Sequence, residues 1–232
     1  MQYLPYLVNF RPMCTNYVSS SRDLIREHLQ TTPLPTFDYV DELWPGYKGP
    51  LLISGFEWRL AMFGMVPYFS KDGKDFRKTY NARAETADQR PTYRGPWRRR
   101  QLGLVPMEAF FEPNYESGKP VRWRIERQDR GLFTVAALWD TWRPTATEIL
   151  HSFSMLTINA NAHPLMSRFH APGDEKRSLA VVPAERREEW LAGGDPRELL
   201  LPFSSDEFIA SPAPLPPRKP KVARPVPEQQ QL

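Results

Sequence analysis

The alternation of apolar and polar residues along the middle of the chain predicts β-strands more often than helices. Val121, Trp123 and Ile125 alternate with polar residues, which is the period-two pattern of a strand with one buried face. Other strands are predicted from short apolar or mixed runs, namely residues 102–106, 133–139, 152–158 and 179–182. Strands without a regular alternation with helices predict an α+β fold: a curved, mostly antiparallel sheet or barrel with peripheral helices.

Three short helices are predicted around these strands, each from a residue type that favours a helix start. A serine or aspartate side chain can cap the first amides of a helix, and proline fits the first helical turn. The predicted helices run from Ser20 or Ser21 to Leu29, from Pro183 to Trp190, and for a short stretch after Asp195.

Length and composition favour one domain with extended ends. A chain of 232 residues with 41% hydrophobic content can bury one substantial core. We expect an N-terminal extension at residues 1–12, upstream of the true start or removed, a domain at residues 13–203, and a disordered proline-rich tail at residues 204–232. No apolar run approaches the roughly 18 residues of a membrane span, so a cytoplasmic protein, nucleoid-associated in a bacterium, is expected.

Cys14 is the only cysteine in the chain and the first candidate for chemistry. A single cysteine cannot form an internal disulfide, which fits a reducing compartment and excludes a zinc site built from cysteines. Cys14 follows Met13, and an initiator methionine before a small residue is commonly removed. Cys14 would then carry an α-amine with a pKa of about 7.7 to 8.0 beside a thiol near about 8.5.

An N-terminal cysteine can capture one aldehyde with both of its nucleophiles. The amine forms a Schiff base, and the thiol then adds to the same carbon to close a five-membered thiazolidine ring. An internal cysteine cannot make this ring. The alternative interpretation of Cys14 is a small residue buried in the core.

The net charge of +4 is concentrated in one segment. Residues 77–100 hold eight basic and two acidic residues, so this segment carries +6 and the rest of the chain −2. Tyr80, Tyr93 and Trp97 lie among these charges, a mixture expected of a groove that follows phosphates and stacks unpaired bases. A solvated surface loop is the alternative.

Three further polar residues are candidate acid, base or orienting groups. Asn81 belongs to a compact polar segment inside the basic stretch, where an ordinary turn is the alternative. Glu112 follows a predicted strand in an aromatic setting suited to acid–base work, where a solvated loop glutamate is the alternative. His170 precedes a glycine-containing loop, where a structural histidine is the alternative.

Taken in order, these segments resemble the SOS response-associated peptidase (SRAP) family, also called abasic site processing proteins. Each segment alone has low specificity, whereas the ordered set, spanning most of residues 13–203, is specific. The segments are Met13-Cys14, Phe63-Gly-Met-Val-Pro67, Asn81-Ala-Arg-Ala-Glu85-Thr86, Leu104-Val-Pro106, Ala109-Phe-Phe-Glu112, Ala137-Leu-Trp139, Thr157-Ile-Asn-Ala-Asn161 and His170.

The resemblance implies an enzyme of the DNA damage response that binds single-stranded DNA and shields abasic sites by a covalent thiazolidine crosslink to Cys14. Asn81 would orient the nucleophile or the sugar, Glu112 would assist proton transfer, and His170 would act as acid or base on the deoxyribose oxygen. Peptidase activity that frees Cys14, and an abasic-site lyase activity, are also implied. The implied DNA-binding residues are Arg83 and Arg177, with Arg94, Arg99 and Arg100 as weaker candidates.

The resemblance implies no metal or organic cofactor, and a monomer that meets single-stranded DNA and replication-fork proteins. The chain departs from the family at three places. Thr15-Asn16 replaces a common glycine and arginine, Pro113 replaces tryptophan, and the segment between His170 and Arg177 is longer than usual. An early phosphate contact is therefore expected to be missing.

The N-terminal extension is the largest departure, because Cys14 has no free amine while residues 1–12 are attached. We expect translation to begin at Met13, with self-cleavage before Cys14 as the alternative. Two other functions use the same residues: a cysteine peptidase that pairs Cys14 with His170 to attack other proteins, and a noncatalytic module that holds single strands. Crosslinking explains best why the cysteine follows a methionine.

Overall fold

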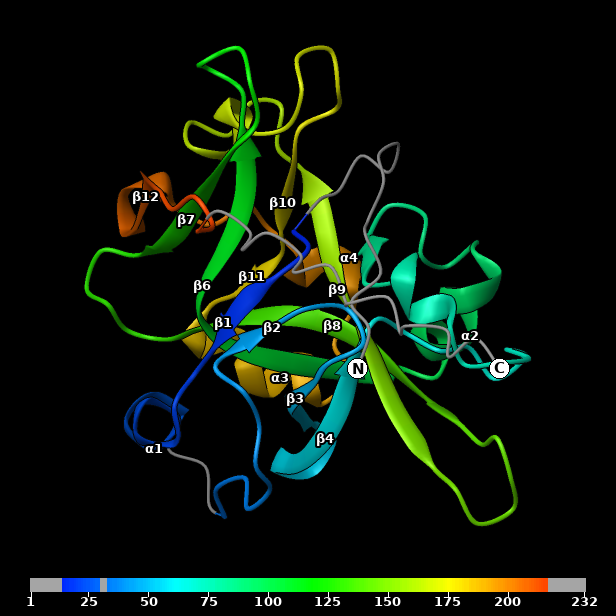
Figure 1. The fold of residues 1–232 in the computed structure, drawn as a ribbon. Helices are drawn as coiled ribbons and strands as arrows, with labels where there is room; N and C mark the ends of the chain where they lie inside the picture. The colour runs from blue at the N-terminus through cyan, green and yellow to red at the C-terminus, as the bar shows by residue number, and fades with distance from the viewer. Residues whose placement is uncertain (1–13, 30–32, 217–232) are drawn as a thin grey trace, which may run out of the picture.

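The computed structural model describes residues 14–29 and 33–216, and its centre is a barrel of five strands (Figure 1). Each strand is hydrogen-bonded to the next, and the last returns to the first. Only the β4–β9 pair among these is parallel. In order around the barrel the strands are β3 (Lys48–Ile53), β4 (Glu57–Phe63), β9 (Leu150–Asn159), β8 (Phe133–Trp142) and β6 (Leu102–Asn114).

Shorter strands extend the sheet beyond the barrel, and helices pack around it. The α+β prediction with a bent sheet is therefore confirmed. The added strands are β1 (Tyr17–Ser19), β2 (Glu42–Leu43), β5 (Asn81–Arg83), β7 (Val121–Arg127), β10 (Arg177–Leu179), β11 (Val181–Val182) and β12 (Phe208–Pro212). The α-helices in the described residues are α1 (Arg22–Leu29), α2 (Pro91–Arg98), α3 (Arg187–Leu191) and α4 (Pro196–Leu199).

Successive residues of the barrel strands enter two different hydrophobic clusters. Val105 belongs to the cluster that contains Cys14, whereas its neighbour Leu104 belongs to a second cluster. The second cluster includes Trp97 of α2 and Trp190 of α3, so these helices cover the opposite face of the strands. Both faces of the barrel strands are therefore buried, which explains why segments such as residues 133–139 are continuous apolar runs rather than alternating ones.

Strand β6 is longer than its sequence pattern predicts. The predicted strand ends at Pro106, but β6 continues to Asn114 and pairs with β7 along its second half. Glu112 consequently lies inside a strand and is buried, not in a solvated loop. Pro106 and Pro113 interrupt the pattern without ending the strand.

The predicted disordered tail starts too early. Residues 208–212 form β12, which pairs with β7, and Phe208 packs against Phe133 and Phe203. A single buried aromatic side chain thus outweighs the high proline content that follows. Residues 217–232 of the predicted tail, and the predicted extension at residues 1–12, lie outside the described residues.

No helix within the described part of the chain combines the length and apolar character that a membrane crossing requires.

Candidate active site

Strand pairing brings Cys14 to Glu112. Tyr17 of β1 lies opposite Phe110 of β6 in an antiparallel ladder, so each step back from Tyr17 corresponds to a step forward along β6 (Figure 1). Cys14 therefore reaches the level of Glu112, and its backbone N–H donates to Glu112 Oε1 at 2.9 Å. The nitrogen atom that would be the α-amine of a chain beginning at Cys14 thus faces a buried carboxylate.

The second oxygen of Glu112 faces His170. His170 Nε2 lies 3.2 Å from Glu112 Oε2, and both side chains are largely buried, with exposed fractions of 6% and 2%. Burial would lower the pKa of His170, but the charge and hydrogen bonding of Glu112 outweigh it and raise this pKa. Glu112 therefore connects the Cys14 nitrogen with an imidazole that favours its protonated form.

The backbone holds His170 in an unusual conformation. Its φ angle is +65°, in the left-handed region that residues other than glycine rarely adopt. The His170 N–H donates to Pro113 O at 2.9 Å, and Lys176 Nζ donates to His170 O at 3.2 Å. Strained backbone that is fixed from both sides is common where a side chain must be aimed at a reaction site.

Asn81 approaches Cys14 from strand β5. Its Nδ2 donates to Cys14 O at 3.1 Å, and its own carbonyl accepts from the Tyr93 hydroxyl at 3.1 Å. Burial raises the pKa of Tyr93 to about 12, so this hydroxyl stays protonated and remains a donor. Helix α2, which carries Tyr93, therefore helps to place Asn81.

The four candidate catalytic residues converge, although they are up to 156 positions apart in the sequence. Among the described residues, two of their buried polar atoms lack a hydrogen-bond partner: Asn81 Oδ1 and His170 Nδ1. Buried polar groups are usually satisfied, so such a concentration marks a site whose remaining donors and acceptors are available to a substrate. The described residues contain no group of three or more His, Cys, Asp or Glu side chains placed to hold a metal ion.

The thiol of Cys14 is buried and protonated. Its Sγ donates to Asn16 O at 3.4 Å, and its exposed fraction is 0%. Burial raises the pKa of the Cys14 thiol, and the charge of Glu112 raises it further. Free thiolate is therefore scarce at neutral pH, and the nitrogen of Cys14 is the better placed first nucleophile.

The two main DNA-binding candidates have different surroundings. The side chain of Arg83 is 51% exposed and pairs with Glu175 at 2.6 Å. Arg177 is 2% exposed, and its guanidinium contacts Glu85, Glu175 and the Thr157 carbonyl. In this conformation Arg177 presents no surface to a phosphate, because these acceptors surround it. Arg177 therefore has a structural role here, and Arg83 is the more accessible of the two candidates.

The other three arginine candidates lie on or just after α2. Arg94 is exposed and has no carboxylate partner among the described residues, whereas Arg99 pairs with Asp140 at 3.2 Å. Arg100 lies 3.7 Å from Asp195. Arg94 and Arg99 line a hollow next to Tyr68. Arg94 is thus the most available cation of the three.

The aromatic residues predicted to stack bases are mostly buried. Tyr80 and Trp97 have exposed fractions of 8% and 4%, because they pack into the two core clusters. The aromatic residues that are exposed near the basic helix are Tyr68 and Phe69, at 71% and 48%. Sequence reasoning missed these two, although they directly follow the Phe63–Pro67 segment of the family pattern.

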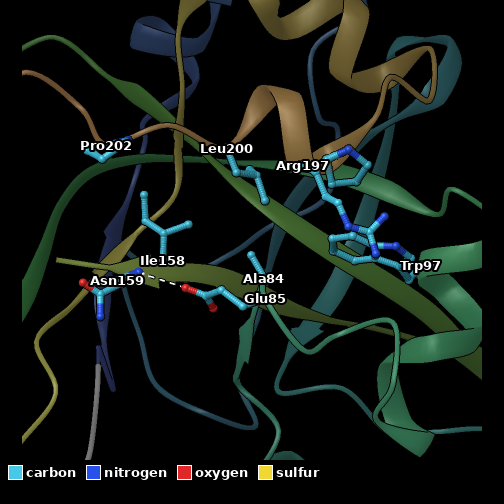
Figure 2. A pocket seen from close by; sticks show the side chains of 9 residues that line it. Ala84, Glu85, Trp97, Ile158, Asn159, Arg197, Leu200 and Pro202 are labelled. Carbon is cyan, nitrogen blue, oxygen red and sulfur yellow. Dashed lines mark hydrogen bonds between the residues drawn. The ribbon is translucent and has the colours of Figure 1, made fainter.

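A separate cavity of about 390 Å³ lies beyond the Glu85–Arg177 ion pair. Figure 2 shows Glu85 and Asn159 at one side of it, joined by a hydrogen bond, and Arg197 beside Trp97 at the other. None of the four converging residues lines this cavity. The candidate active site is therefore separate from this pocket.

Comparison with known proteins identifies the family. The family model described as SOS response associated peptidase (SRAP) matches residues 13–213. The abasic site processing protein YobE of Bacillus subtilis (strain 168) is 29% identical over 154 residues, which are 64% of this chain and 67% of the relative. The similarly named YoqW of the same organism is 28% identical over 64% of this chain and 65% of its own length.

Solved structures share the fold. A protein from Bordetella bronchiseptica superposes with a TM-score of 0.82 and 32% identity, covering 87% of this chain and 100% of the other. A protein from Bacteroides thetaiotaomicron has a TM-score of 0.70 and 21% identity over 85% of this chain and 90% of the other, which shows the fold alone. The matched segment ends at residue 213, beyond the domain boundary predicted at residue 203.

Proposed function

Because the chain belongs to the SOS response associated peptidase family, we propose that it processes abasic sites in DNA by forming a covalent crosslink through Cys14. One observation carries the proposal: Glu112 lies between the backbone nitrogen of Cys14 and the imidazole of His170. A carboxylate at this place can accept a proton from an α-ammonium group and deliver it elsewhere. The substrate is the ring-opened deoxyribose aldehyde in single-stranded DNA.

The residues at the site supply each step of the proposed reaction. The free Cys14 amine attacks the aldehyde carbon, and Glu112 takes the proton that the nitrogen loses. The His170–Glu112 pair passes this proton to the former aldehyde oxygen and then delivers a second proton, which the nitrogen also loses, so the oxygen leaves as water and a neutral Schiff base remains. The Cys14 thiol then adds its sulfur to the same carbon and its proton to the nitrogen, which closes the thiazolidine.

Asn81 and Arg83 have supporting roles in this proposal. Asn81 holds the Cys14 carbonyl, and its free Oδ1 can accept a hydrogen bond from a sugar hydroxyl. Arg83 binds a neighbouring phosphate, and Arg94 with the exposed ring of Tyr68 continues the path of the strand. The monomeric state and contact with replication-fork proteins stay predictions, as do the peptidase and lyase activities.

The test uses protein expressed from Met13, from which the initiator methionine is removed, and single-stranded DNA with one abasic site. We expect an adduct that survives heating and has the mass of protein plus DNA minus one water. Hydrolysis of unrelated peptides would favour the peptidase hypothesis instead. Salt-sensitive binding without a covalent product would favour the noncatalytic module.

The geometry does not favour a peptidase pair of Cys14 and His170. The thiol donates to Asn16 O, while the imidazole faces Glu112. A thiol–imidazole nucleophile needs the two groups within hydrogen-bond reach of each other.

The ion pair of His170 and Glu112 predicts how stability depends on pH. Since the pKa of His170 is raised in the folded state, the pair stabilises the fold fully below the ordinary histidine pKa of about 6.5. This stabilisation is lost as the pH rises through the raised value. Urea unfolding from about pH 6 to about pH 9 should show the difference in free energy between the wild type and His170→Gln shrinking as the pH rises.

His163 provides the control for that experiment. Its pKa is lowered by burial, so its contribution is present at high pH and is lost as the pH falls. The difference between the wild type and His163→Gln should therefore grow as the pH rises. A pH-independent difference for His170→Gln would contradict the ion pair.

Glu175 competes with phosphate for Arg83 in this proposal. The Glu175→Gln variant removes a negative charge from Arg83 while Arg177 keeps its contacts with Glu85. We expect roughly threefold to tenfold tighter binding of single-stranded DNA at low salt, and a salt dependence steeper by about 0.7 in log–log slope. Fluorescence anisotropy at several salt concentrations measures both. Glu116→Gln, which frees Arg168 instead, is the control, and unchanged or weaker binding by Glu175→Gln would refute the competition.

A further inference from the structure

Asn16 occupies a central place beside Cys14. It is 2% exposed, and its carbonyl accepts from the Cys14 thiol at 3.4 Å and from the Phe111 N–H at 3.3 Å. Its Nδ2 donates to Glu42 Oε1. Asn16 therefore links the nucleophile to β6 and to β2, but it brings no positive charge.

The positive charge beside Asn16 comes from a guanidinium on another strand, which contacts the same carboxylate. Arg122 of β7 donates from Nη2 to the same Glu42 Oε1 at 2.5 Å. Its guanidinium carbon lies 3.3 Å from the ring centroid of Phe111, and its Nη1 donates to Ala213 O at 3.1 Å. The side chain is 19% exposed, and within the described residues its buried Nε has no hydrogen-bond partner.

Glu42 and Phe111 thus receive contacts from both Asn16 and Arg122. Glu42 accepts from the two side chains at one oxygen. Phe111 donates its N–H to Asn16 and stacks its ring under Arg122. A stacked, carboxylate-paired guanidinium is a rigid anchor, because its planar fork fixes both partners. The segment that begins at Cys14 is fixed at this anchor two residues downstream.

We propose that Arg122 is a positioning residue for the crosslinking reaction, acting through Glu42, Asn16 and Phe111 to hold the Cys14 nitrogen against Glu112. It does not bind DNA phosphate, because Glu42 neutralises its charge and its side chain is mostly covered. This inference rests on the proposed function.

The charge of Arg122 also acts on the thiol. Burial and Glu112 raise the pKa of Cys14, and Arg122 opposes them by lowering it. Removing Arg122 should therefore reduce the reactivity of the thiol toward a small alkylating agent, which needs no DNA. This readout separates the inference from the proposed function.

The experiment compares Arg122→Gln with the wild type, both beginning at Cys14. Iodoacetamide alkylation measured against pH reports the thiol. Affinity for single-stranded DNA with a tetrahydrofuran abasic analogue, which lacks the aldehyde, reports binding. The crosslinking rate at saturating abasic DNA reports positioning, and we expect it to fall by about 10-fold to 100-fold while affinity changes less than about twofold. The alkylation profile should shift to higher pH.

Two further variants make the test specific. Arg124 lies on the same strand near the same Phe111 ring but pairs with Glu126, so Arg124→Gln should leave all three readouts unchanged. Arg122→Lys keeps the charge but not the planar fork, so it should keep the alkylation profile of the wild type while losing crosslinking rate.

Several outcomes would overturn the inference. One is a wild-type crosslinking rate in Arg122→Gln, and another is an equal loss of affinity and rate, which would indicate a phosphate contact. If Arg122→Gln does not fold, Glu42→Gln replaces it with the same expectation for the crosslinking rate, and an unaltered rate in that variant overturns the inference too. Failure of the wild type to crosslink, with the alkylation shift present, would refute the proposed function and leave the anchor in place.

Discussion

Replacing Cys14 with alanine is expected to abolish the heat-stable adduct with abasic single-stranded DNA. The variant keeps an N-terminal amine near Glu112, so it can still form a Schiff base, but it has no thiol to close the ring. A Schiff base hydrolyses, whereas a thiazolidine has two bonds to the captured carbon. Denaturing gels after heating should therefore show the adduct only for the wild type.

Borohydride makes this prediction sharper, because it reduces a Schiff base to a stable amine. With borohydride present, Cys14→Ala should give an adduct, which proves that the variant is folded and binds the aldehyde. Cys14→Ser is the matched control, since it keeps a nucleophilic oxygen of similar size. Crosslinking by Cys14→Ala at the wild-type level without reductant would refute the role of the thiol.

A chain that keeps Met1 to Met13 is expected to form no heat-stable adduct. The Cys14 nitrogen is then an amide, which does not react with aldehydes, and the thiol alone gives only a reversible addition product. The loss should be complete, because the amine is a reactant and not an auxiliary group. Parallel assays of proteins that begin at Met1 and at Cys14, with the mass of each intact chain measured first, test this prediction.

The same mass measurement identifies the mature protein made in its natural host. A chain that begins at Cys14 agrees with a translation start at Met13. A chain that keeps residues 1–12 and still crosslinks would exclude the thiazolidine mechanism. Cleavage before Cys14 in purified Met1 protein, absent in Glu112→Gln, would instead support self-processing.

The strands could be predicted where burial requires a run or an alternation of apolar residues. Residues 133–139 are almost all apolar because both faces of β8 are covered, one by the barrel core and one by helices. The closure of the barrel could not be predicted, because it depends on pairing between β3 and β6, which are about 50 residues apart. Local periodicity contains no information on such partners.

The candidate site was predicted as a set of residue types, but its geometry was not. Cys14, Asn81, Glu112 and His170 could be chosen from the family pattern, whereas their contacts depend on three strands and a loop. Arg177 was chosen as a phosphate ligand from its place in the chain. Only the structure shows that Glu85 and Glu175 surround it.

Helix α2 was missed for a different reason. Its segment contains two prolines, a glycine and two arginines, a composition typical of a loop. Pro91 occupies the first turn, where proline costs no hydrogen bond, and Trp97 supplies the buried contact. A helix with only one or two residues facing the core has no apolar periodicity from which it could be predicted.

Strand β6 belongs to both the barrel and the active site. Its first half is hydrogen-bonded to β3 and β8, and its second half carries Glu112 between β1 and β7. Because β6 is hydrogen-bonded to neighbouring strands along both halves, a change at its active-site half is transmitted to its barrel half. Amide hydrogen exchange along residues 102–107 should therefore slow once DNA is attached at Cys14. The exchange rate of these barrel amides would then show whether the crosslink has formed.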